Sequence, residues 1–373
     1  MKKASIKNIL VPIDFSRMSI QGIETAKRLG RRFGAAIHVA HVYQPAYPAG
    51  FMGPAEAWGQ LPVSFEEETS KQQLKTVAGR CGLSPGDKTH LRKGAPVFDV
   101  ICSLAAEIPA DLLVVPTRAS RGIKRFFLGS TAERLVQHCP CPVLIGRKSA
   151  AQLPMDLPAG PALRIDKILV PADFSSCSLE GLRYAIQFAQ KFVAKIAVLH
   201  VLDLGYSQPI DSHASYDLTR YARAALKDAQ AQMRKFVRLV KFGRVRFDTA
   251  LVIGTPVEQI SDFALVQDVD LIITATHGLT GFRHILIGSI AEHLVRQSRV
   301  PILVVPSHPE MRAANLASAR EWQPRLRQKI GKASKDKQGA VQTEKRAKRH
   351  GKLPAHRFPK PRKTNSLRES HSF

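Results

Sequence analysis

The chain repeats one pattern twice at a fixed spacing, and this repeat constrains its fold more than any other feature. The segment ILVPIDFS at residues 9–16 returns as ILVPADFS at residues 168–175, so that Asp14 corresponds to Asp173, 159 residues later. The same spacing relates DLLVV at 111–115 to DLIIT at 270–274, and LGSTAERLV at 128–136 to IGSIAEHLV at 287–295. A repeat of this length and order predicts two copies of one structural unit.

Length and charge divide the chain further. At 373 residues it is longer than one typical domain and can hold two, each with its own core. We expect a first domain at residues 1–147, a linker rich in Pro, Ala and Gly at 148–164, and a second domain at 165–306. The remaining tail, residues 307–373, has 18 Lys or Arg and 5 Asp or Glu. Its net charge is therefore +13, which is half of the chain's net charge of +26. Because it has few large apolar residues, we expect the tail to be disordered.

Short runs of Val, Ile and Leu alternate with helical patterns in each copy. The runs at 7–13, 36–42, 111–116 and 141–146 are largely apolar, as in strands covered on both faces. In the second copy, apolar residues at intervals of three and four indicate one face of a helix; they are Leu218, Tyr221, Ala222, Ala225, Leu226, Ala229, Met233, Phe236, Val237 and Val240. The alternation predicts an α/β fold with two tandem doubly wound domains. Ligands of such sheets bind beyond the carboxyl ends of the strands, where the strand order reverses.

The stretch ATHGLTGFRHILIGS at residues 275–289 lies where such a ligand would bind, between a strand pattern and a helical pattern. Free N–H groups at a helix start attract an anion, and Ser289 can cap the helix or bond a phosphate oxygen. Gly278 permits close approach of a ligand to the backbone. The alternative is an ordinary turn, in which Ser289 is only the N-cap. Neither a P-loop nor a GxGxxG dinucleotide motif occurs in the sequence.

Taken in order, ILVPxDFS, THG, GSxAE and a final strand of the PVLVV type resemble the universal stress protein family, as a tandem pair over about residues 5–147 and 165–306. The resemblance implies a five-stranded parallel sheet in each copy and a bound adenine nucleotide, ATP, ADP or AMP, with Mg²⁺ as an optional companion. It also implies pairing through the last strands, PVLIG and PILVV, either between the two copies as a pseudo-dimer or in a homodimer.

The resemblance assigns roles to residues of the second copy. The family motif GxxG, nine residues, then G[ST] matches 275–289, with Ala275 in place of the first Gly. Ala adds one methyl group there and loses easy access to positive φ. The motif implies phosphate contacts from Gly278, Gly288, Ser289 and the backbone of Ile290 and Ala291, a ribose contact from Asp173, and an adenine contact from the backbone of Val201. Pro171, Thr274, Ala275 and His277 complete the expected nucleotide-binding set.

The first copy departs further from this motif. Pro116 and Ala119 stand at the two leading Gly positions, where Pro fixes φ and removes a donor and Ala limits close approach. We therefore expect weak or absent nucleotide binding in this copy. The corresponding residues are Asp14, Val42, Gly129, Ser130 and Thr131. The intervening loop is basic, with Arg118, Arg121, Lys124 and Arg125, and it either attracts phosphate or is solvated surface.

Some of these residues have structural alternatives. Asp14 and Asp173 precede helical patterns, and we favour helix capping for Asp14 and ribose contact for Asp173. His41 and His200, at strand ends, are expected to be structural. His277 and His284 lie near the phosphate loop without a Ser/Asp constellation or a metal-ligand set, so no catalytic residue and no metal site is assigned.

Five cysteines in a long chain do not indicate a disulfide framework. Cys139 and Cys141 form a lone CxC, which is more typical of buried core thiols than of a metal site. No apolar run is long enough to span a bilayer, and the first residues do not resemble a signal peptide. We expect a cytoplasmic protein.

Three functions fit the sequence. The first is a nucleotide-binding stress or signalling protein that uses mainly the second copy and hydrolyses the nucleotide slowly or not at all. The second is a nucleotide-free interaction module, and the third is a slow ATPase, which is less favoured because no motif places a carboxylate pair or a Lys for Mg²⁺ and phosphate. The tail adds either binding to a polyanion, such as nucleic acid or an anionic surface, or a solubilising extension.

Overall fold

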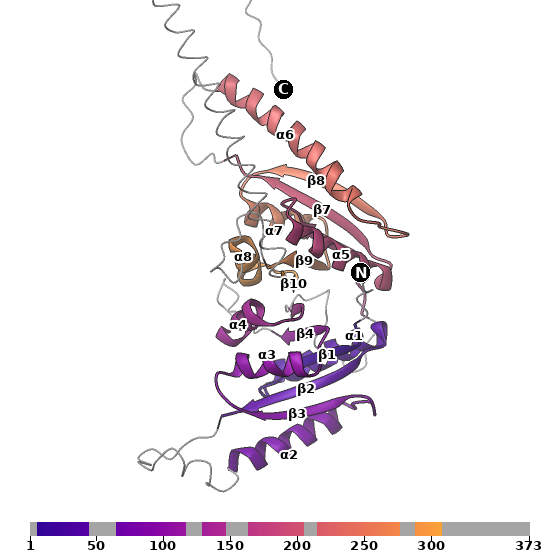
Figure 1. Ribbon diagram of the computed structural model, residues 1–373, viewed down its shortest axis with the longest axis vertical. Helices are drawn as coiled ribbons and strands as arrows, with labels where there is room; N and C mark the ends of the chain where they lie inside the picture. Colours follow the sequence, from indigo (N-terminus) through magenta and orange to yellow (C-terminus); the bar gives the residue numbers. More distant parts are fainter. Residues whose placement is uncertain are drawn as a thin grey trace, which may run out of the picture. The chain divides into compact units, whose positions relative to one another are not determined.

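The structure, a computed structural model, describes residues 6–44, 65–116, 129–146, 163–204, 215–276 and 288–307 (Figure 1). The expected linker, except for residues 163 and 164, and the tail beyond Ser307 lie outside the described residues. In the described ranges, no helix is long and apolar enough to cross a membrane.

The first copy alternates strands and helices. Its elements are β1 (Asn8–Pro12), α1 (Arg17–Phe33), β2 (Ala36–Tyr43), α2 (Phe65–Arg80), β3 (Lys88–Lys93), α3 (Val97–Glu107), β4 (Leu112–Pro116), α4 (Ser130–His138) and β5 (Val143–Gly146). The apolar runs of the sequence are strands here, and β1, β4 and β5 are buried through their middle residues. The sequence of β3 is polar and its residues are exposed or half-buried, as is typical of an edge strand.

The second copy repeats this order. Its elements are β6 (Lys167–Pro171), α5 (Ser176–Phe192), β7 (Lys195–Leu202), α6 (Ser215–Arg238), β8 (Phe247–Ile253), α7 (Pro256–Val266), β9 (Leu271–Ala275), α8 (Ser289–Gln297) and β10 (Ile302–Val305). The helix predicted from the apolar periodicity around Met233 and Phe236 is α6, and both of these side chains are buried against the sheet.

The ten strands of the described ranges belong to one sheet, with the order β3-β2-β1-β4-β5-β10-β9-β6-β7-β8. Within each copy the neighbouring strands are parallel. In the first copy the chain passes from β1 to β2 and β3 on one side of β1, and then to β4 and β5 on the other side. The second copy follows the same path from β6. The predicted α/β class, with two tandem doubly wound copies of a five-stranded parallel sheet, is confirmed.

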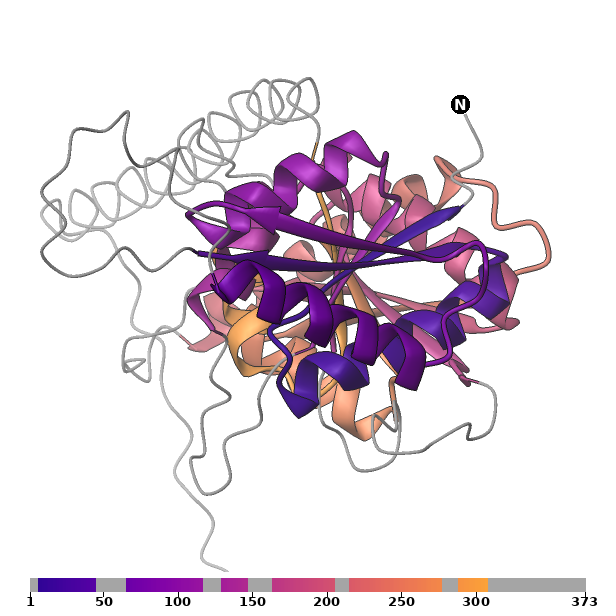
Figure 2. The same cartoon turned by 90° about the horizontal axis from the view of Figure 1, so that it is seen from below.

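Helices cover both faces of the sheet (Figure 2). One hydrophobic cluster contains side chains of α1, α2, α5 and α6, and a second contains side chains of α3, α4, α7 and α8. Alternate residues of one strand contribute to different clusters, as Leu10 and Val11 of β1 do, because successive side chains of a strand point to opposite faces. The full burial of the central strands explains their nearly continuous apolar sequence.

The two copies meet along their last strands. β5 and β10 pair in an antiparallel manner, with Leu144 opposite Leu303. Beside this junction Arg296 of α8 forms an ion pair with Glu133 of α4, and this hydrogen bond raises the pKa of the Arg296 guanidinium. On the other face, the rings of Phe33 and Phe188 lie 5.0 Å apart. The strands that the sequence resemblance pairs are therefore joined within one chain, and a homodimer stays a prediction.

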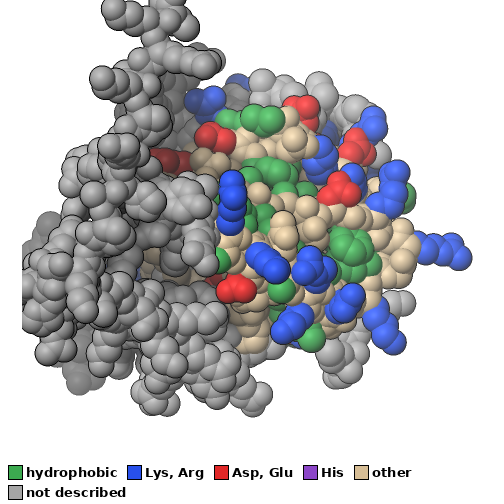
Figure 3. Space-filling model, turned by 90° about the horizontal axis from the view of Figure 1, so that it is seen from above, with side chains coloured by type: hydrophobic (Ala, Val, Ile, Leu, Met, Phe, Trp, Pro, Cys, Tyr) green, Lys and Arg blue, Asp and Glu red, His purple; other side chains and the backbone are tan. Residues whose placement is uncertain are grey.

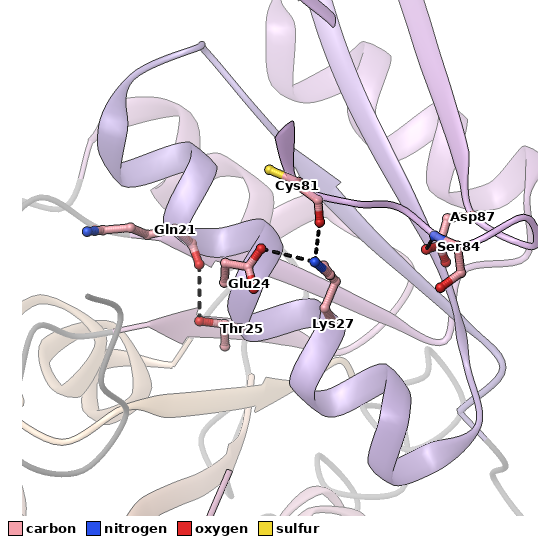
Figure 4. Close-up of polar contacts among 7 residues, drawn as sticks. All are labelled: Gln21, Glu24, Thr25, Lys27, Cys81, Ser84 and Asp87. Atoms are coloured by element: carbon pink, nitrogen blue, oxygen red, sulfur yellow. Dashed lines mark hydrogen bonds and ion pairs between the residues drawn. The ribbon is translucent and has the colours of Figure 1, made fainter. Parts of the chain in front are cut away.

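Polar contacts fix the turn that follows α2 against α1 and β2 (Figure 4). Lys27 of α1 donates to the carbonyl of Cys81 and pairs with Glu24 at 3.2 Å. The carboxylate of Asp87 accepts from the backbone N–H of Ser84 at 2.6 Å and of Ile37 at 2.8 Å. These contacts set the point at which the chain enters the edge strand β3.

Candidate functional site

The carboxyl ends of β6, β7 and β9 form the edge at which the second-copy residues were expected. β6 lies between β7 and β9 in the sheet, and the chain passes from β6 to β7 on one side before it returns to β9 on the other. This reversal is the position where open α/β sheets bind ligands. The structure places Pro171 at the end of β6, Val201 near the end of β7, and Thr274 and Ala275 at the end of β9.

Asp173 follows β6 and is half-buried. Its Oδ1 accepts the backbone N–H of Ser175 at 3.0 Å, and Ser175 accepts the N–H of Ser178 as the N-cap of α5. Asp14 makes the same 3.0 Å contact with Ser16, which is the N-cap of α1. The expectation that Asp14 caps the helix itself is therefore wrong. In both copies Ser is the cap, because it directly precedes the first helical residue and its hydroxyl accepts the N–H three residues on, and the Asp carboxylate holds the turn that precedes it.

His200 is structural, as expected. Its Nδ1 donates to the carbonyl oxygen of Ala172 at 2.7 Å, and its ring stacks on Phe174 with centroids 4.2 Å apart. Burial lowers the pKa of this imidazole, which therefore stays neutral at pH 7. Phe174 has a φ of 65°, an unusual value for an aromatic residue, and the stacked ring fixes the chain just after Asp173. His41 and Phe15 repeat this arrangement in the first copy.

Ala275 ends β9 and is buried. It pairs with Val305 of β10 and is not among the described residues with positive φ. The replacement of the first motif Gly by Ala therefore does not strain the backbone at this position. Gly181 of α5 faces the peptide between Thr274 and Ala275, where an added Cβ would lie 3.6 Å from the Ala275 nitrogen.

Helix α8 begins next to the end of β9. The backbone N–H of Gly288 donates to the carbonyl of Thr276 at 2.6 Å, so the start of α8 is bonded to the residue that follows β9. Gly288 is the N-cap and Ser289 is the first helical residue, so the alternative in which Ser289 is the N-cap is wrong. Ser289 and Ile290 are exposed, whereas Ala291 is buried against the sheet.

The first turn of α8 has the properties of an anion site. The N–H groups of Ser289, Ile290 and Ala291 have no acceptor within the helix, because an α-helix leaves its first amides unpaired. The aligned peptide dipoles add positive potential at the same end. His277 and Gly278, and His284 further along the loop, lie outside the described residues, as do Arg118, Ala119, Arg121, Lys124 and Arg125 of the first copy.

The first copy contains a hollow at the corresponding helix start. Gly129 is the N-cap of α4, Ser130 and Thr131 are exposed in its first turn, Asp14 is exposed and Val42 is buried in β2. The hollow has a volume of about 450 Å³ and is lined by Gln44, Pro96, Val97, Phe98, Ser130, Thr131 and Arg134. Pro116 ends β4, and its ring lies 3.0 Å from the position of a Cβ added at Gly22.

Sequence reasoning missed five of the seven residues that line this hollow, including Arg134 and Phe98. The guanidinium of Arg134 lies over the ring of Phe98, 5.1 Å from its centroid. Arg134 stands four residues after Ser130, which places both on the same side of α4, so the helical spacing was a usable signal. Phe98 had no such signal, since it reaches the hollow only through the packing of α3 beside α4. In the second copy, the positions of Arg134 and Phe98 are occupied by His293 and Val257.

Cys139 and Cys141 are core residues, as expected, whereas Cys102 is only half-buried. All five cysteines are free thiols, and Cys139 and Cys141 are buried with their sulfur atoms 3.5 Å apart. Hydrogen bonds from Cys102 and Cys141 lower the pKa of the Cys139 thiol. No group of three or more His, Cys, Asp or Glu side chains is arranged to hold a metal ion in the part of the chain that the structure describes.

Comparisons with known proteins agree with this architecture. The pattern of the universal stress protein family matches residues 5–147 and 164–306. A universal stress protein of Methanocaldococcus jannaschii is 31% identical over 139 residues, which are 37% of this chain and 81% of the relative. The crystal structure of a universal stress protein from Archaeoglobus fulgidus matches 82% of this chain and 98% of its own, with 18% identity and a TM-score of 0.53. A solved universal stress protein in complex with cAMP matches 38% of this chain at 22% identity, with a TM-score of 0.27. With both copies matched and the fold in agreement, the chain belongs to the universal stress protein family, as a tandem pair of its domains.

Proposed function

We propose that the chain is a stress-response or signalling protein that binds an adenine nucleotide, ATP or AMP, mainly in its second copy. The bound nucleotide would change the conformation of the protein or its choice of partner. The domains that we propose are residues 1–147 and 165–306, joined by the linker 148–164. The proposal goes beyond family membership because it names the ligand and the copy that binds it.

The observation that carries the proposal is the meeting of three strand ends with the start of α8 at the reversal point of the sheet. The 2.6 Å bond from Gly288 to Thr276 ties that helix start to β9. Phosphates would accept hydrogen bonds from the first amides of α8 and from the hydroxyl of Ser289. The positive end of the helix dipole would attract the phosphates to the same place. Gly278 and His277 would complete the phosphate contacts from the intervening loop.

The remaining residues supply the other two parts of a nucleotide. Asp173 has a carboxylate oriented by its bond to the N–H of Ser175, which suits recognition of a ribose hydroxyl. The backbone of Val201, two strands away from β9, would bond the adenine edge, with Pro171, Thr274 and Ala275 beneath the ligand. We assign no catalytic residue, so the nucleotide acts as a signal, with Mg²⁺ as an optional companion of the phosphates.

Titration calorimetry with matched variants tests this assignment. Freshly purified, nucleotide-stripped protein is titrated with ATP, with and without Mg²⁺, and separately with AMP. In Gly288→Val, a branched side chain at the N-cap covers the α8 amides, and the affinity is expected to fall at least about tenfold, or about 1.4 kcal/mol. Gly288 and Gly129 have extended backbones, with φ of −69° and −63°, so Val fits both without backbone strain.

Gly129→Val is the matched control for the first copy, where the position of an added Cβ has no neighbour within 4 Å among the described atoms. One site per chain that only Gly288→Val abolishes would support the second copy as the sensor. Loss of binding only in Gly129→Val would assign the nucleotide to the hollow of the first copy instead. No binding to the unmodified protein would overturn the proposal and favour the nucleotide-free interaction module, while turnover of ATP would favour a slow ATPase.

Two further assignments belong to this proposal. The five free thiols support a reducing compartment, and we place the protein in the cytoplasm.

The tail is a candidate polyanion-binding segment because of its 18 basic residues. Truncation after Pro306, which leaves β10 complete, is expected to weaken binding to heparin, and unchanged binding would exclude the tail.

A further inference from the structure

Helix α6 and the turn that leads to β8 present an unusually basic surface. Eight side chains form it, and we name them the α6–β8 basic face: Arg223, Lys227, Arg234, Lys235, Arg238, Lys241, Arg244 and Arg246. All eight are exposed. Figure 3, viewed onto α6 and β8, shows Lys and Arg side chains gathered on this side with few Asp and Glu among them.

The basic side chains follow the helix as a stripe. At about 100° per residue, four of them lie within about 60° of one another around the axis, namely Arg223, Lys227, Arg234 and Arg238. At 1.5 Å per residue, this stripe is about 22 Å long. Lys241, Arg244 and Arg246 continue the positive charge past the end of the helix. The surface is therefore an extended row of cations.

Little within the described structure neutralises this charge. Residues 222–248 include only two acidic residues, Asp228 and Asp248, and Asp248 pairs with Lys195 of β7. Among the described residues, none of the eight cations forms an ion pair. Their mutual repulsion is unfavourable for folding, so the arrangement suits an external anionic partner better than it suits stability.

The first copy shows that the fold itself does not require these cations. The corresponding segment, residues 63–89, forms the same helix and edge strand with four basic and four acidic residues, and its net charge is zero. In the second copy, eight basic and two acidic residues give +6. Lys75 in α2 corresponds to Arg234 in α6, whereas the acidic run Glu66–Glu68 has no counterpart there. The positive charge is thus specific to one of two structurally equivalent surfaces.

The apolar side of α6 is already occupied. Ala229, Met233 and Phe236 are buried, the last two against β7 and the core beneath it. A helix that inserts into a lipid surface needs its apolar side free, so α6 cannot dock on a membrane in that way. Single-stranded nucleic acid needs aromatic platforms. On this face Phe247 is exposed, but its ring is stacked on the buried Phe242 with centroids 3.7 Å apart, and residues 222–248 offer no second exposed ring.

We propose that the α6–β8 basic face binds the phosphate backbone of double-stranded nucleic acid without reading its sequence. A duplex carries one negative charge per about 1.7 Å of its axis, so a rigid row of cations about 22 Å long can follow several phosphates. Release of condensed counterions drives the binding, which therefore weakens steeply with salt. This surface lies on α6 and the turn that leads to β8, and it is separate from the strand ends at which a nucleotide is proposed.

Fluorescence anisotropy of a labelled 30-base-pair duplex, titrated with the full chain at several salt concentrations, tests the proposal. The variant Arg234→Glu/Arg238→Glu reverses the two charges in the C-terminal half of the stripe. Its affinity is expected to fall more than tenfold, with the slope of log K against log salt reduced by about 2, since two phosphate contacts are lost. Arg234→Gln/Arg238→Gln should give a smaller loss of the same kind.

The matched control is Lys71→Glu/Lys75→Glu in α2, which makes the same change of total charge on the equivalent helix of the first copy. It is expected to keep most of the affinity and most of the salt slope. All of these residues are exposed, and an unchanged melting temperature verifies that each variant folds. Equal losses in both charge-reversal variants would overturn the proposal, because binding would then follow total charge. So would no loss in the α6 variants, or a loss seen only with phosphatidylglycerol vesicles or single-stranded DNA.

Discussion

At the scale of single residues, the two copies differ at the end of their first helix. Gly34 ends α1 with a φ of 74°, whereas Val193 ends α5 with a φ of 59° and is 78% exposed. A left-handed conformation suits Gly and is strained for a β-branched residue. Val193→Gly is therefore expected to raise the free energy of unfolding by about 0.5–1 kcal/mol, after the greater freedom of Gly in the unfolded chain is subtracted.

The reciprocal variant Gly34→Val is the control, because its Cβ would meet no other atom within 4 Å. It should lower the free energy of unfolding by about 1 kcal/mol through backbone strain alone. Urea unfolding followed by circular dichroism measures both changes. Effects of the same sign in the two variants would contradict this account.

A pair of histidines makes stability depend on pH. His38 Nδ1 lies 2.9 Å from His90 Nε2, and burial lowers the pKa of both imidazoles below 6.5. The unfolded chain therefore binds more protons than the folded chain as pH falls through 6.5, so stability decreases on acidification. In the second copy the same positions hold Ala197 and Thr249.

The double variant His38→Ala/His90→Thr introduces the second-copy pair. We expect the melting temperature to change less between pH 7.5 and pH 5 than in the unmodified protein, and thermal unfolding at a series of pH values measures it. His200, whose pKa is also lowered, should maintain part of the pH dependence. An unaltered pH profile in the double variant would show that the His38–His90 pair does not titrate on unfolding.

At the scale of secondary-structure elements, Ser16 and Ser175 start equivalent helices. Each side chain accepts the N–H of the third residue after it, at 3.2 Å for Ser16 and 3.0 Å for Ser175. Ser16→Ala and Ser175→Ala should each lower the free energy of unfolding by about 1 kcal/mol, as for other N-caps. Both hydroxyls also bond the Ser hydroxyl three residues on, but Ser175 is buried whereas Ser16 is half-buried, so the loss at Ser175 is expected to be the larger in denaturant titrations. A negligible effect at both positions would mean that the Asp carboxylates hold the helix starts without the caps.

At the scale of the whole molecule, the two copies share one sheet and a continuous hydrophobic cluster. Leu144 of β5 and Leu303 of β10 are paired across the junction and belong to the same cluster as the cores of both copies. Leu303→Ala should therefore lower the free energy of unfolding by about 2–5 kcal/mol, and the copies should still unfold in a single calorimetric transition. Leu74→Ala, in α2 near the opposite edge strand, is the control and should also shift one transition. Two separate transitions in the unmodified protein would contradict this coupling.

The sequence by itself determined the architecture. The repeat and the apolar runs located β1, β2, β4 and β5 and the fold class, because strands covered on both faces must be apolar along their length. The edge strand β3 has no such run and β8 has only the short run ALVI at residues 250–253, since one side of an edge strand is exposed, and only the family resemblance implied a fifth strand. The motif near Ser289 was located correctly at a helix start, but the alternative in which Ser289 is the N-cap was wrong, because Gly288 occupies that position.

Only the tertiary structure decided how distant residues meet. It placed Asp173, Val201 and the start of α8 at one reversal point, showed that β5 and β10 pair within one chain, and brought Phe98 beside Arg134. It also showed that Ala275 is an unstrained strand residue and that the cations of α6 share one exposed side. Local sequence specifies which segments become strands and helices, because the spacing of apolar residues follows the period of each element and the faces that it buries. Contacts between segments depend on packing in three dimensions, which no single stretch of sequence records.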